Sequence, residues 1–379
     1  MTNNRVEVTR RNWGQRILAS IKGVLFGLLL FFAAFVVIWQ TEGRTDMSRI
    51  AEQSTPISAA SINSDTEGQL VAANGRLTSS DPIGDPAYLS AGEYIQLERQ
   101  VEMYAWVERT RTQTEQSVGG SETTTTEYYY ERTWTNNPPN SSNFRDPAGH
   151  ENPQLTVSNQ TFVANNVRVG AYGIDANQIR LPPAQTVNLA SAMLVPGTHR
   201  VDGDYVYIGN GSLQQPAVGD VRIGYRAVPA NIDVTVFGQQ QGDRLISYVD
   251  RDGNQLYRAF TGSREAGIAA MSSEYRTAGW IGRGAGFFMM WIGLSLVLGP
   301  VSVFFSVIPF LGNLSGKMIR FVTFGIALVI AGITSIVAMV LQSFVGLVCV
   351  GLLLLGAVGG GTWLLAQRRG ATQQTASAG

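Results

Sequence analysis

Cysteine and histidine are nearly absent from this sequence. Its 379 residues include one cysteine, Cys349, which lies inside an apolar run, so the polar middle of the chain can form no disulfide and offers no thiol for catalysis. The two histidines are His150 and His199. No HExxH, GxSxG, CxxC or P-loop motif occurs, so hydrolytic and phosphate-binding chemistry lack their usual residues. These absences predict a protein that is not an enzyme and that binds no metal or cofactor.

Charge of one sign is missing from whole stretches of the chain. The formal net charge of zero combines +3 over residues 1–43, −7 over 44–283 and +4 over 284–379, and no acidic residue follows Glu274. The basic residues do not form the concentrated patch that binds nucleic acid. We therefore expect no nucleic-acid partner.

Long apolar tracts are present near both ends of the chain. A transmembrane helix needs roughly 20 mostly apolar residues, and a buried helix of a soluble protein seldom runs so far without a charge. The first tract is longer than the apolar core of a signal peptide, and no Ala-x-Ala site follows it closely, so we interpret it as a retained anchor. Four transmembrane helices are predicted, at 21–40, 284–308, 318–341 and 344–366.

Basic residues in the short flanking segments predict the direction of these helices. Cytoplasmic loops are enriched in Lys and Arg, which here precede the first span, separate the second from the third, and follow the fourth. The predicted cytoplasmic segments are 1–20, 309–317 and 367–379, with an uncharged outer turn at 342–343. Residues 41–283 are then expected on the far side, periplasmic in a bacterium or lumenal in a eukaryote.

Aromatic and charged residues mark the expected contacts of this domain with the membrane surface. Trp39 would lie in the interfacial belt, and Glu42 and Arg44 would begin the outer segment. Trp280 and Arg283 occupy the corresponding place where the chain returns towards the second span. We expect all five residues at the membrane interface.

The polar middle of the chain alternates short β-rich runs with turn signals between about residues 66 and 260. Gln69–Leu77 is expected to be a strand that ends on the turn signal Asn74-Gly75, and Thr123–Trp134, rich in threonine and tyrosine, is also expected to be a strand. Thr161–Ile179 and Ser263–Trp280 have apolar residues at helical spacing. The predicted fold class is a membrane protein with four transmembrane α-helices and a large, mainly β (α+β) extramembrane domain inserted between the first two.

One turn-rich segment of this domain is a candidate contact site. It contains His150, Glu151, Asn152 and Pro153, and its two X-Pro pairs restrict the backbone. The functional interpretation makes His150 and Glu151 part of a ligand or contact site, whereas the structural alternative makes them polar groups that stabilise a loop. His199 is expected in an exposed turn.

The apolar tracts contain glycines at a spacing of four, which lets helices approach closely. Packing within the four-helix bundle and self-association of the chain are both open as explanations. The glycines concerned are Gly23, Gly27, Gly282, Gly286, Gly356 and Gly360. Gly299-Pro300 is expected to kink the second span or to end its regular part.

The polar residues within the spans leave a transport function as the alternative. The interior of each span has no ionisable residue, which argues against an ion-coupled pump. Thr323, Thr334, Ser335 and Gln342 are the main polar candidates for lining a path. The hypothesis is a channel or lipid-handling transporter that uses polar groups of the third and fourth spans.

Several separate motifs in one order, with one span before the large domain and three after it, resemble a known family. The chain is similar over nearly its whole length to the LUMA family, also called the transmembrane protein 43 family. The motifs are the Trp-x-x-Glu-Gly-Arg exit at Trp39 to Arg44, VEMYAWVE at Val101–Glu108, GHENP at Gly149–Pro153, VGDVR at Val218–Arg222 and AGW at Ala278–Trp280.

This resemblance implies cytoplasmic termini, a large lumenal or periplasmic domain, self-association, and no established enzymatic activity. In animals the family is associated with the endoplasmic reticulum and inner nuclear membrane. The short third-to-fourth turn, the polar tail without a retention signal, the few lysines and the many glycines favour a bacterial homologue in the cytoplasmic membrane. We expect a multi-pass, non-enzymatic scaffold that organises membrane, with the lipid bilayer, a second copy and other membrane proteins as partners.

Overall fold

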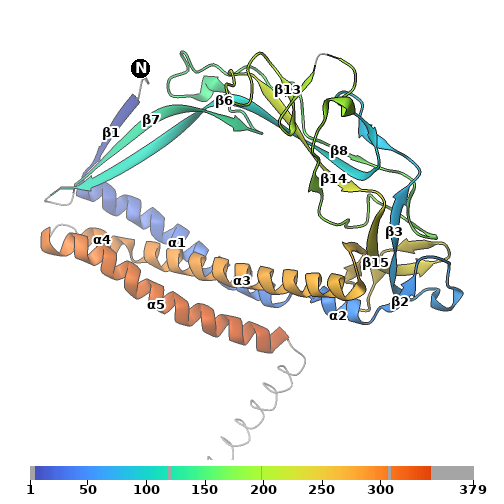
Figure 1. The fold of residues 1–379 in the computed structure, drawn as a ribbon. Coiled ribbons are helices and arrows are strands. Elements are labelled where there is room, and N and C mark those ends of the chain that lie inside the picture. Colours follow the sequence, from blue (N-terminus) through green and yellow to red (C-terminus); the bar gives the residue numbers. More distant parts are fainter. Residues whose placement is uncertain (1–4, 118–120, 198, 306–308, 343–379) are drawn as a thin grey trace, which may run out of the picture. The chain divides into compact units, whose positions relative to one another are not determined.

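The computed structural model describes residues 5–117, 121–197, 199–305 and 309–342. The described residues divide into two compact units, which we call the β-rich unit and the helical unit (Figure 1). The β-rich unit contains residues 5–9, 46–114 and 124–275. The described residues of the helical unit are 10–45, 115–117, 121–123, 276–305 and 309–342.

Two sheets make up most of the β-rich unit. The larger follows the order β1 (Arg5–Arg11), β7 (Glu122–Thr135), β6 (Tyr94–Gln116), β14 (Val221–Pro229), β13 (Tyr205–Ile208) and β12 (Arg200–Asp202), with β11 (Gln185–Thr186) on β14 and β8 (Gln160–Val163) on β6. Two short hairpins lie outside both sheets, β4 (Ile83–Asp85) with β5 (Leu89–Gly92), and β17 (Tyr248–Val249) with β18 (Gln255–Leu256).

The second sheet contains a closed ring of strands. Its members are β19 (Arg258–Thr261), β15 (Ile232–Gln241), β16 (Arg244–Ile246), β10 (Tyr172–Ile174), β9 (Val167–Val169), β3 (Leu70–Ser79) and β2 (Thr55–Ser58). Because β15 also pairs with β3, strands β15, β16, β10, β9 and β3 close on one another. Closure removes the exposed strand edges that promote aggregation.

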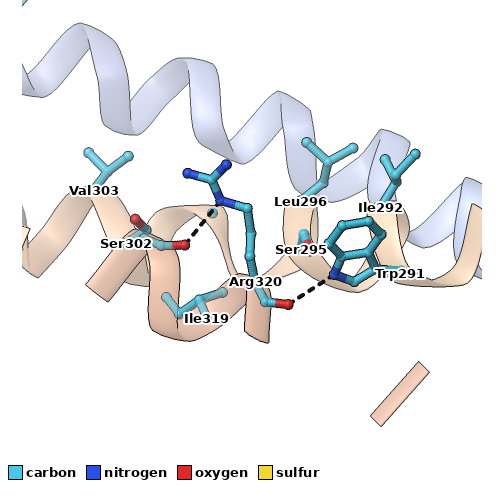
Figure 2. Close-up of a pocket in the computed structure, with 10 residues that line it drawn as sticks. Trp291, Ile292, Ser295, Leu296, Ser302, Val303, Ile319 and Arg320 are labelled. Atoms are coloured by element: carbon cyan, nitrogen blue, oxygen red, sulfur yellow. Dashed lines mark hydrogen bonds between the residues drawn. The ribbon is translucent and has the colours of Figure 1, made fainter. Parts of the chain in front are cut away.

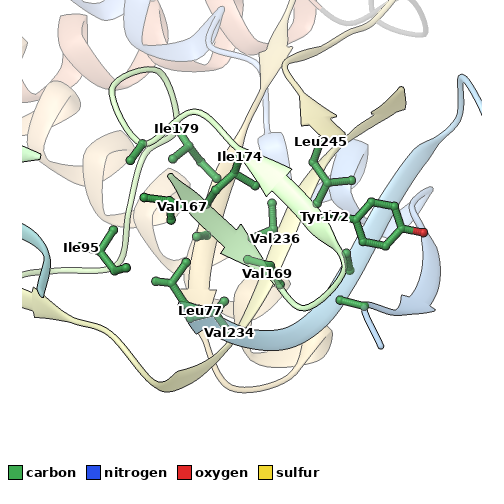
Figure 3. Close-up of a cluster of buried hydrophobic side chains, with 14 of the residues drawn as sticks. Leu77, Ile95, Val167, Val169, Tyr172, Ile174, Ile179, Val234, Val236 and Leu245 are labelled. Carbon is green, nitrogen blue, oxygen red and sulfur yellow. The ribbon is translucent and has the colours of Figure 1, made fainter. Parts of the chain in front are cut away.

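Alternating apolar residues explain where the cores of this unit lie. In β14, Val221, Ile223 and Tyr225 are buried on one face against β6, as the two-residue period of a strand requires. In β15, Val234 and Val236 point into the ring of strands, where Figure 3 shows them beside residues of β3 and β9. Both patterns agree with the strands expected from the sequence in these regions.

Two expectations for the β-rich unit were wrong. Asn74-Gly75 lies inside β3 rather than in a turn, and Gly75 is needed because a Cβ there would lie 2.7 Å from the Cβ of Ala59. Thr161–Ile179 forms strands β8, β9 and β10 instead of a helix. Its apolar residues fill the cores of two sheets, and tertiary packing outweighed the helical spacing.

Five α-helices are described. They are α1 (Trp13–Glu42), α2 (Met47–Glu52), α3 (Arg264–Val297), α4 (Gly299–Phe305) and α5 (Pro309–Gln342), and three short 3-10 helices lie at Ser64–Thr66, Ser141–Asn143 and Ser191–Met193. Three helices are long and apolar enough to cross a membrane by length and composition, within Trp13–Glu52, Arg264–Val297 and Gly316–Gln342. The fourth predicted span, 344–366, lies outside the described residues.

The helices begin and end at recognisable signals. Asn12 caps α1 by accepting a hydrogen bond of 2.8 Å from the backbone N–H of Gln15, whose side chain in turn accepts from the Asn12 N–H at 3.1 Å. This cap starts α1 well before residue 21. The helix expected at Ser263–Trp280 is confirmed as the first part of α3, which ends before Gly299-Pro300 as predicted.

Strand β1 is an element that the sequence did not indicate. It occupies part of the segment expected in the cytoplasm, yet it pairs with β7 of the domain expected on the opposite side. Glu7 of β1 also lies 2.5 Å from Arg145, an ion pair within the β-rich unit. The N-terminal segment and the large domain therefore share one sheet.

Candidate functional site

Close glycine contacts hold α1 against α3 in the helical unit. A Cβ on Gly27 would lie 2.7 Å from the carbonyl oxygen of Gly293 and 2.8 Å from the Cβ of Leu296. Gly286 is covered by Ile38, and Gly282 by Thr41, so the two helices run antiparallel. The structure thus places Gly27, Gly282 and Gly286 at this interface, where only glycine allows the backbones to approach so closely.

The remaining glycines of the predicted spacing pattern are not shown in such close contacts. Gly23 is less crowded, because a Cβ there would lie 3.9 Å from the side chain of Leu296. Gly356 and Gly360 lie outside the described residues. On α5, in contrast, a Cβ added at Gly325 or Gly332 would have no described atom within 4 Å. That side of α5 is open within the described part of the chain.

Helices α1 and α5 present large apolar side chains to the exterior of the described part of the helical unit. On α1 these side chains recur at three- and four-residue intervals, and Leu25 is 70% exposed. On α5, Phe321 is 79% exposed. Further exposed apolar residues are Leu18, Ile21, Leu29, Phe32 and Val36 on α1, and Leu328, Val329, Ile333, Ile336 and Val337 on α5. A continuous apolar surface of this kind indicates contact with lipid or with protein.

The five predicted interface residues lie at or just beside the end of α1 and near the middle of α3. Glu42 accepts two hydrogen bonds from Arg283, at 2.7 and 2.9 Å, and the guanidinium of Arg283 lies 5.4 Å from the ring centre of Trp280. Trp280 itself is 71% exposed. Arg44 donates to the carbonyl of Thr41 at 3.1 Å. The structure therefore brings Glu42, Trp280 and Arg283 together.

Trp39, the fifth of these residues, takes part through its backbone. Its carbonyl accepts a 2.7 Å hydrogen bond from the side chain of Gln342, so the ends of α1 and α5 lie together. Its indole is about half exposed. Gln342, a candidate for lining a transport path, thus caps a neighbouring helix instead.

The opposite end of α1 carries a second ion pair, which no local pattern indicated. Arg16 is buried, and its Nε lies 3.3 Å from a carboxylate oxygen of Glu122 at the start of β7. One turn earlier, the indole N–H of Trp13 donates to the carbonyl of Val303 in α4 at 3.2 Å. Each end of α1 is therefore anchored by a charged pair.

A cavity of about 400 Å³ lies between α3, α4 and α5. Its walls are mainly apolar, with Ile292, Leu296 and Ile319 among them, and Arg320 lies beside them (Figure 2). The Nε of Arg320 donates to the carbonyl of Gly316 at 3.2 Å, and no carboxylate among the described residues pairs with its guanidinium. The site combines an apolar volume with a cation.

The other polar groups of α5 bond to nearby helix atoms. The hydroxyl of Thr323 donates to the carbonyl of Ile319 at 2.8 Å, and the hydroxyl of Thr334 donates to that of Ile330 at 2.7 Å. Thr323 also lies 2.9 Å from the Ser295 hydroxyl of α3. These bonds satisfy the hydroxyls within an apolar surrounding.

His150 is packed between aromatic rings in the β-rich unit. Its ring stacks on Tyr130 with the centres 3.9 Å apart, and Trp106 approaches it edge-on at 4.9 Å. Its Nδ1 lies 3.0 Å from the carbonyl oxygen of Asp146. Burial, together with the hydrogen bond that the phenol donates to Glu108 at 2.8 Å, raises the pKa of Tyr130. This arrangement stabilises a loop on β6 and β7.

The neighbours of His150 also bond to the backbone. Asn152 accepts a 2.7 Å hydrogen bond from the N–H of Trp106 and donates to its carbonyl at 2.9 Å, much as a paired strand would. Glu151 accepts from the N–H of Gly149 at 3.1 Å. Its own N–H and that of Gly149 lower the pKa of Glu151. Pro153 packs beside Gly219, whose φ of 96° favours glycine.

Two buried polar networks were not anticipated. Asp85, 1% exposed, lies 2.8 Å from Arg99 and accepts a 2.7 Å hydrogen bond from Tyr225. Asp220 accepts from the hydroxyl of Tyr207 at 2.6 Å and from several backbone N–H groups. Both carboxylates are saturated by donors, as buried charges must be. His199, expected in an exposed turn, is half-buried, with its ring centre 5.0 Å from that of Tyr88.

The described residues contain no group of three or more His, Cys, Asp or Glu side chains placed to hold a metal ion. The polar clusters of these residues join loops to strands. Most of their exposed large apolar side chains lie on the surface of the helical unit. We therefore take as the candidate functional site the exposed faces of α1 and α5, with the cavity beside Arg320.

Comparison with known proteins adds a family to this description. The family model described as "Transmembrane protein 43" matches residues 103–344. The chain is 30% identical over 307 residues to Transmembrane protein 43 of Mus musculus, covering 75% of each chain, and 29% identical over 306 residues to that of Homo sapiens, again with 75% of each covered. The homologue of Drosophila melanogaster is 25% identical over 248 residues, which are 63% of this chain and 66% of that protein.

No solved structure matches the chain. The family match nevertheless covers most of the β-rich unit and all described residues of α3, α4 and α5. The motifs at Gly149–Pro153, Val218–Arg222 and Ala278–Trp280 lie within the matched residues, whereas the motif at Trp39 to Arg44 lies before them. The chain belongs to the Transmembrane protein 43 family.

Proposed function

We propose that this protein is a non-enzymatic membrane scaffold, in which the helical unit binds the bilayer and the β-rich unit offers a surface to other proteins. The observation that carries the proposal is the apolar exterior of α1 and α5, exemplified by Leu25 and Phe321. Burying such a surface in lipid is favourable at roughly 25 cal/mol per Å² of apolar area. The family's membrane character supports it.

The proposal also specifies the membrane in which the protein is located and that the chain self-associates. We place the protein in a bacterial cytoplasmic membrane with the β-rich unit on the periplasmic face, or in the endoplasmic reticulum or inner nuclear membrane of a eukaryote. An added Cβ at Gly325 or Gly332 of α5 would meet no atom of the described residues within 4 Å, and this supports self-association, because small exposed residues let a second helix approach closely.

Disulfide cross-linking in native membranes tests self-association. In a Cys349→Ser background, Gly332→Cys places a thiol on the open side of α5, whereas Ala331→Cys, at a site 6% exposed, places it against the bundle. We expect a dimer with Gly332→Cys under mild oxidation and monomer with Ala331→Cys. Cross-linking followed by mass spectrometry then identifies neighbouring membrane proteins. A chain that remains monomeric and captures no neighbour contradicts the scaffold proposal.

The cavity beside Arg320 favours a second candidate, a lipid-handling role. An acyl chain fits walls such as Leu296 and Ile319, and a phosphate is the natural partner of a guanidinium without a carboxylate. Reconstituted vesicles would be assayed for lipid scrambling and for ion flux. Scrambling that falls with Arg320→Gln supports this role, whereas no scrambling at high protein density rejects it.

A further inference from the structure

Arg320 of α5 lies beside a cavity whose other walls are mainly apolar. The cavity measures about 400 Å³ and opens to the exterior of the described residues, and Figure 2 shows the Arg320 side chain among the residues that line it. Small-molecule sites commonly have volumes of about 300–1,000 Å³, apolar walls and a few placed polar groups. In size and composition, the cavity therefore resembles a binding site for an amphipathic molecule.

Two hydrogen bonds hold Arg320 in place. Its backbone carbonyl accepts a bond of 2.9 Å from the indole N–H of Trp291 in α3, and its Nε donates to the carbonyl of Gly316 at 3.2 Å. Trp291 and Gly316 also line the cavity. These bonds use only one nitrogen of the guanidinium, so its Nη1 and Nη2 groups can donate the paired hydrogen bonds that phosphates accept.

Lys317 supplies a second cation on α5, and its side chain is exposed. Residues three apart on a helix are neighbours on its surface, with Cβ atoms about 5–6 Å apart. The ion pairs within the described part of the helical unit involve neither Lys317 nor Arg320. No acidic residue follows Glu274 in the sequence. Like charges at this spacing repel each other, so an anion bound between them would stabilise the helix.

The apolar walls favour a lipid over a small anion. Ile292 and Leu296 of α3, Val303 of α4 and Ile319 of α5 line the cavity. An acyl chain can pack against these side chains. Inorganic phosphate would leave the walls without contacts and would lose its own hydration beside them, which is costly for a charged group.

The position of the two cations along α5 matches the headgroup level of a membrane. Phe321, directly after Arg320, is 79% exposed, and no charged residue lies between it and Gln342 in the sequence. Basic side chains at the end of such an apolar run lie among lipid headgroups. A phosphate at this level can contact Lys317 and Arg320 while its acyl chain enters the cavity.

We infer that the cavity holds one anionic phospholipid, with its phosphate bound by Lys317 and Arg320 and one acyl chain packed against Leu296 and Ile319. The inference rests on the lipid-handling role proposed for the same cavity, and it names the class of lipid. It requires binding but no transfer of lipid between leaflets. It assumes neither side of the membrane for the start of α5.

The two cations also predict which headgroup is preferred. Phosphatidylcholine carries a quaternary ammonium beside its phosphate, and this cation would be repelled by Lys317 and Arg320. Phosphatidylglycerol carries the same phosphate without a neighbouring cation. Because like charges in contact weaken binding, we expect a preference on the order of tenfold for phosphatidylglycerol.

Native mass spectrometry of the full-length chain, purified in mild detergent, tests the inference. Phosphatidylglycerol and phosphatidylcholine with identical acyl chains are titrated separately into delipidated protein, and the dissociation constant of the first bound lipid is measured. We expect this constant to be about tenfold lower for phosphatidylglycerol. Equal constants, or no retained lipid of either kind, overturn the inference.

Charge-neutralising variants show whether the cavity is the place where this lipid binds. Arg320→Gln should raise the dissociation constant of phosphatidylglycerol about tenfold and remove its preference over phosphatidylcholine. Arg276→Gln removes the same charge from an exposed position of α3 outside the cavity and should change neither. Lys317→Gln takes the place of Arg320→Gln if that variant does not fold. Equal losses in the cavity variant and in Arg276→Gln would show that net charge alone attracts the lipid, which overturns the inference.

A bulky side chain tests the acyl chain separately. Ile319→Trp narrows the cavity, keeps both cations and should weaken the binding of both lipids by a similar factor. Glycerol phosphate, which has the phosphate but no acyl chain, should not displace bound phosphatidylglycerol at equal concentration. Unchanged affinity in Ile319→Trp, or displacement by glycerol phosphate, would assign the cations to a free anion and overturn the inference.

Scrambling assays in reconstituted vesicles separate this inference from the role on which it rests. A chain that binds phosphatidylglycerol selectively but scrambles no lipid holds a resident lipid, which supports the inference and rejects lipid handling. A chain that scrambles lipid, but whose headgroup preference does not depend on Arg320, supports lipid handling and overturns the inference.

Discussion

The carboxylate of Glu7 and the guanidinium of Arg145 lie 2.5 Å apart and join the segment before α1 to the loop that follows β7. The residues are 138 positions apart in the sequence, and no local pattern connects them. The pair therefore reports on whether the N-terminal strand is docked. Its behaviour on charge reversal gives the first prediction.

Reversing Glu7 to arginine is expected to undock β1. Two guanidinium groups would then face each other, and amide hydrogens of residues 5–11 should exchange faster than in the unmodified chain. Exchanging both charges, as Glu7→Arg with Arg145→Glu, restores attraction and should restore most of the protection. Hydrogen exchange with mass spectrometry measures the effect. Equal exchange in all three proteins would mean that backbone pairing alone holds β1.

The buried pair of Asp85 and Arg99 should matter far more than exposed pairs. Asp85→Ala leaves the Arg99 guanidinium buried without its carboxylate and removes the acceptor of Tyr225, so we expect a loss of about 3–5 kcal/mol in the free energy of unfolding. Urea unfolding followed by intrinsic fluorescence measures it. Glu131→Ala breaks the exposed pair with Arg109 and serves as the control, with no measurable change expected.

His150 is expected to stabilise its loop through ring contacts. His150→Ala removes the stack on Tyr130 and the edge contact with Trp106, for a loss of about 1–2 kcal/mol. His150→Phe keeps a ring and should recover more than half of that loss. If both variants are equally destabilised, the hydrogen bond to the Asp146 carbonyl is the more important contact. The same urea unfolding assay distinguishes these outcomes.

The crowded glycines of α1 and α3 should not tolerate a side chain. Gly27→Leu places atoms where the Gly293 carbonyl lies, and we expect a loss of about 1–3 kcal/mol or failure to fold. Gly284→Leu adds the same side chain to α3 at a position where a Cβ would meet no described atom within 4 Å, and it should leave the thermal midpoint unchanged. Light-scattering or fluorescence melts in mild detergent compare the two variants. Equal midpoints would show that α1 and α3 do not pack in this way.

Particular residues show how far the sequence predicts this molecule. Threonine- and tyrosine-rich sequence identified the strand at Thr123–Trp134, and length with hydropathy identified three long helices. The prediction at Gly75 was wrong because an Asn-Gly pair is typical of a turn. In the structure Gly75 lies within a strand, where the absence of a side chain leaves room for Ala59. The helix predicted at Thr161–Ile179 was wrong because the apolar residues of this segment are buried in two sheets, against partners far along the chain.

The sequence indicated which kinds of residue contribute to the candidate site, but not which of these residues contact one another. The glycine spacing pointed to close helix packing, but only the structure pairs Gly27 with Gly293. Nothing near Arg16 indicated Glu122, which lies far along the chain, and nothing in β1 indicated β7. Local sequence indicates the apolar faces, whereas long-range pairing decides which segments share one sheet.

Alkaline pH should destabilise the β-rich unit through its buried tyrosines. Burial and the hydrogen bond to Asp85 raise the pKa of Tyr225 above its ordinary value, and burial with a bond to Asp220 does the same for Tyr207. Because the neutral phenol is favoured in the folded state, this contribution to stability is complete below about pH 10 and is lost as pH rises above that value. Each such group lowers the free energy of unfolding by at most about 1.4 kcal/mol per pH unit.

Urea midpoints measured from about pH 8 to about pH 11.5, a range that spans the ordinary pKa of tyrosine, should therefore be level at first and then fall. Tyr225→Phe should be less stable at the lower end of this range, because Asp85 loses a donor. Its midpoint should nevertheless fall less steeply at high pH, since one titrating phenol has been removed. A variant with the same slope as the unmodified chain would show that Tyr225 does not titrate in this range.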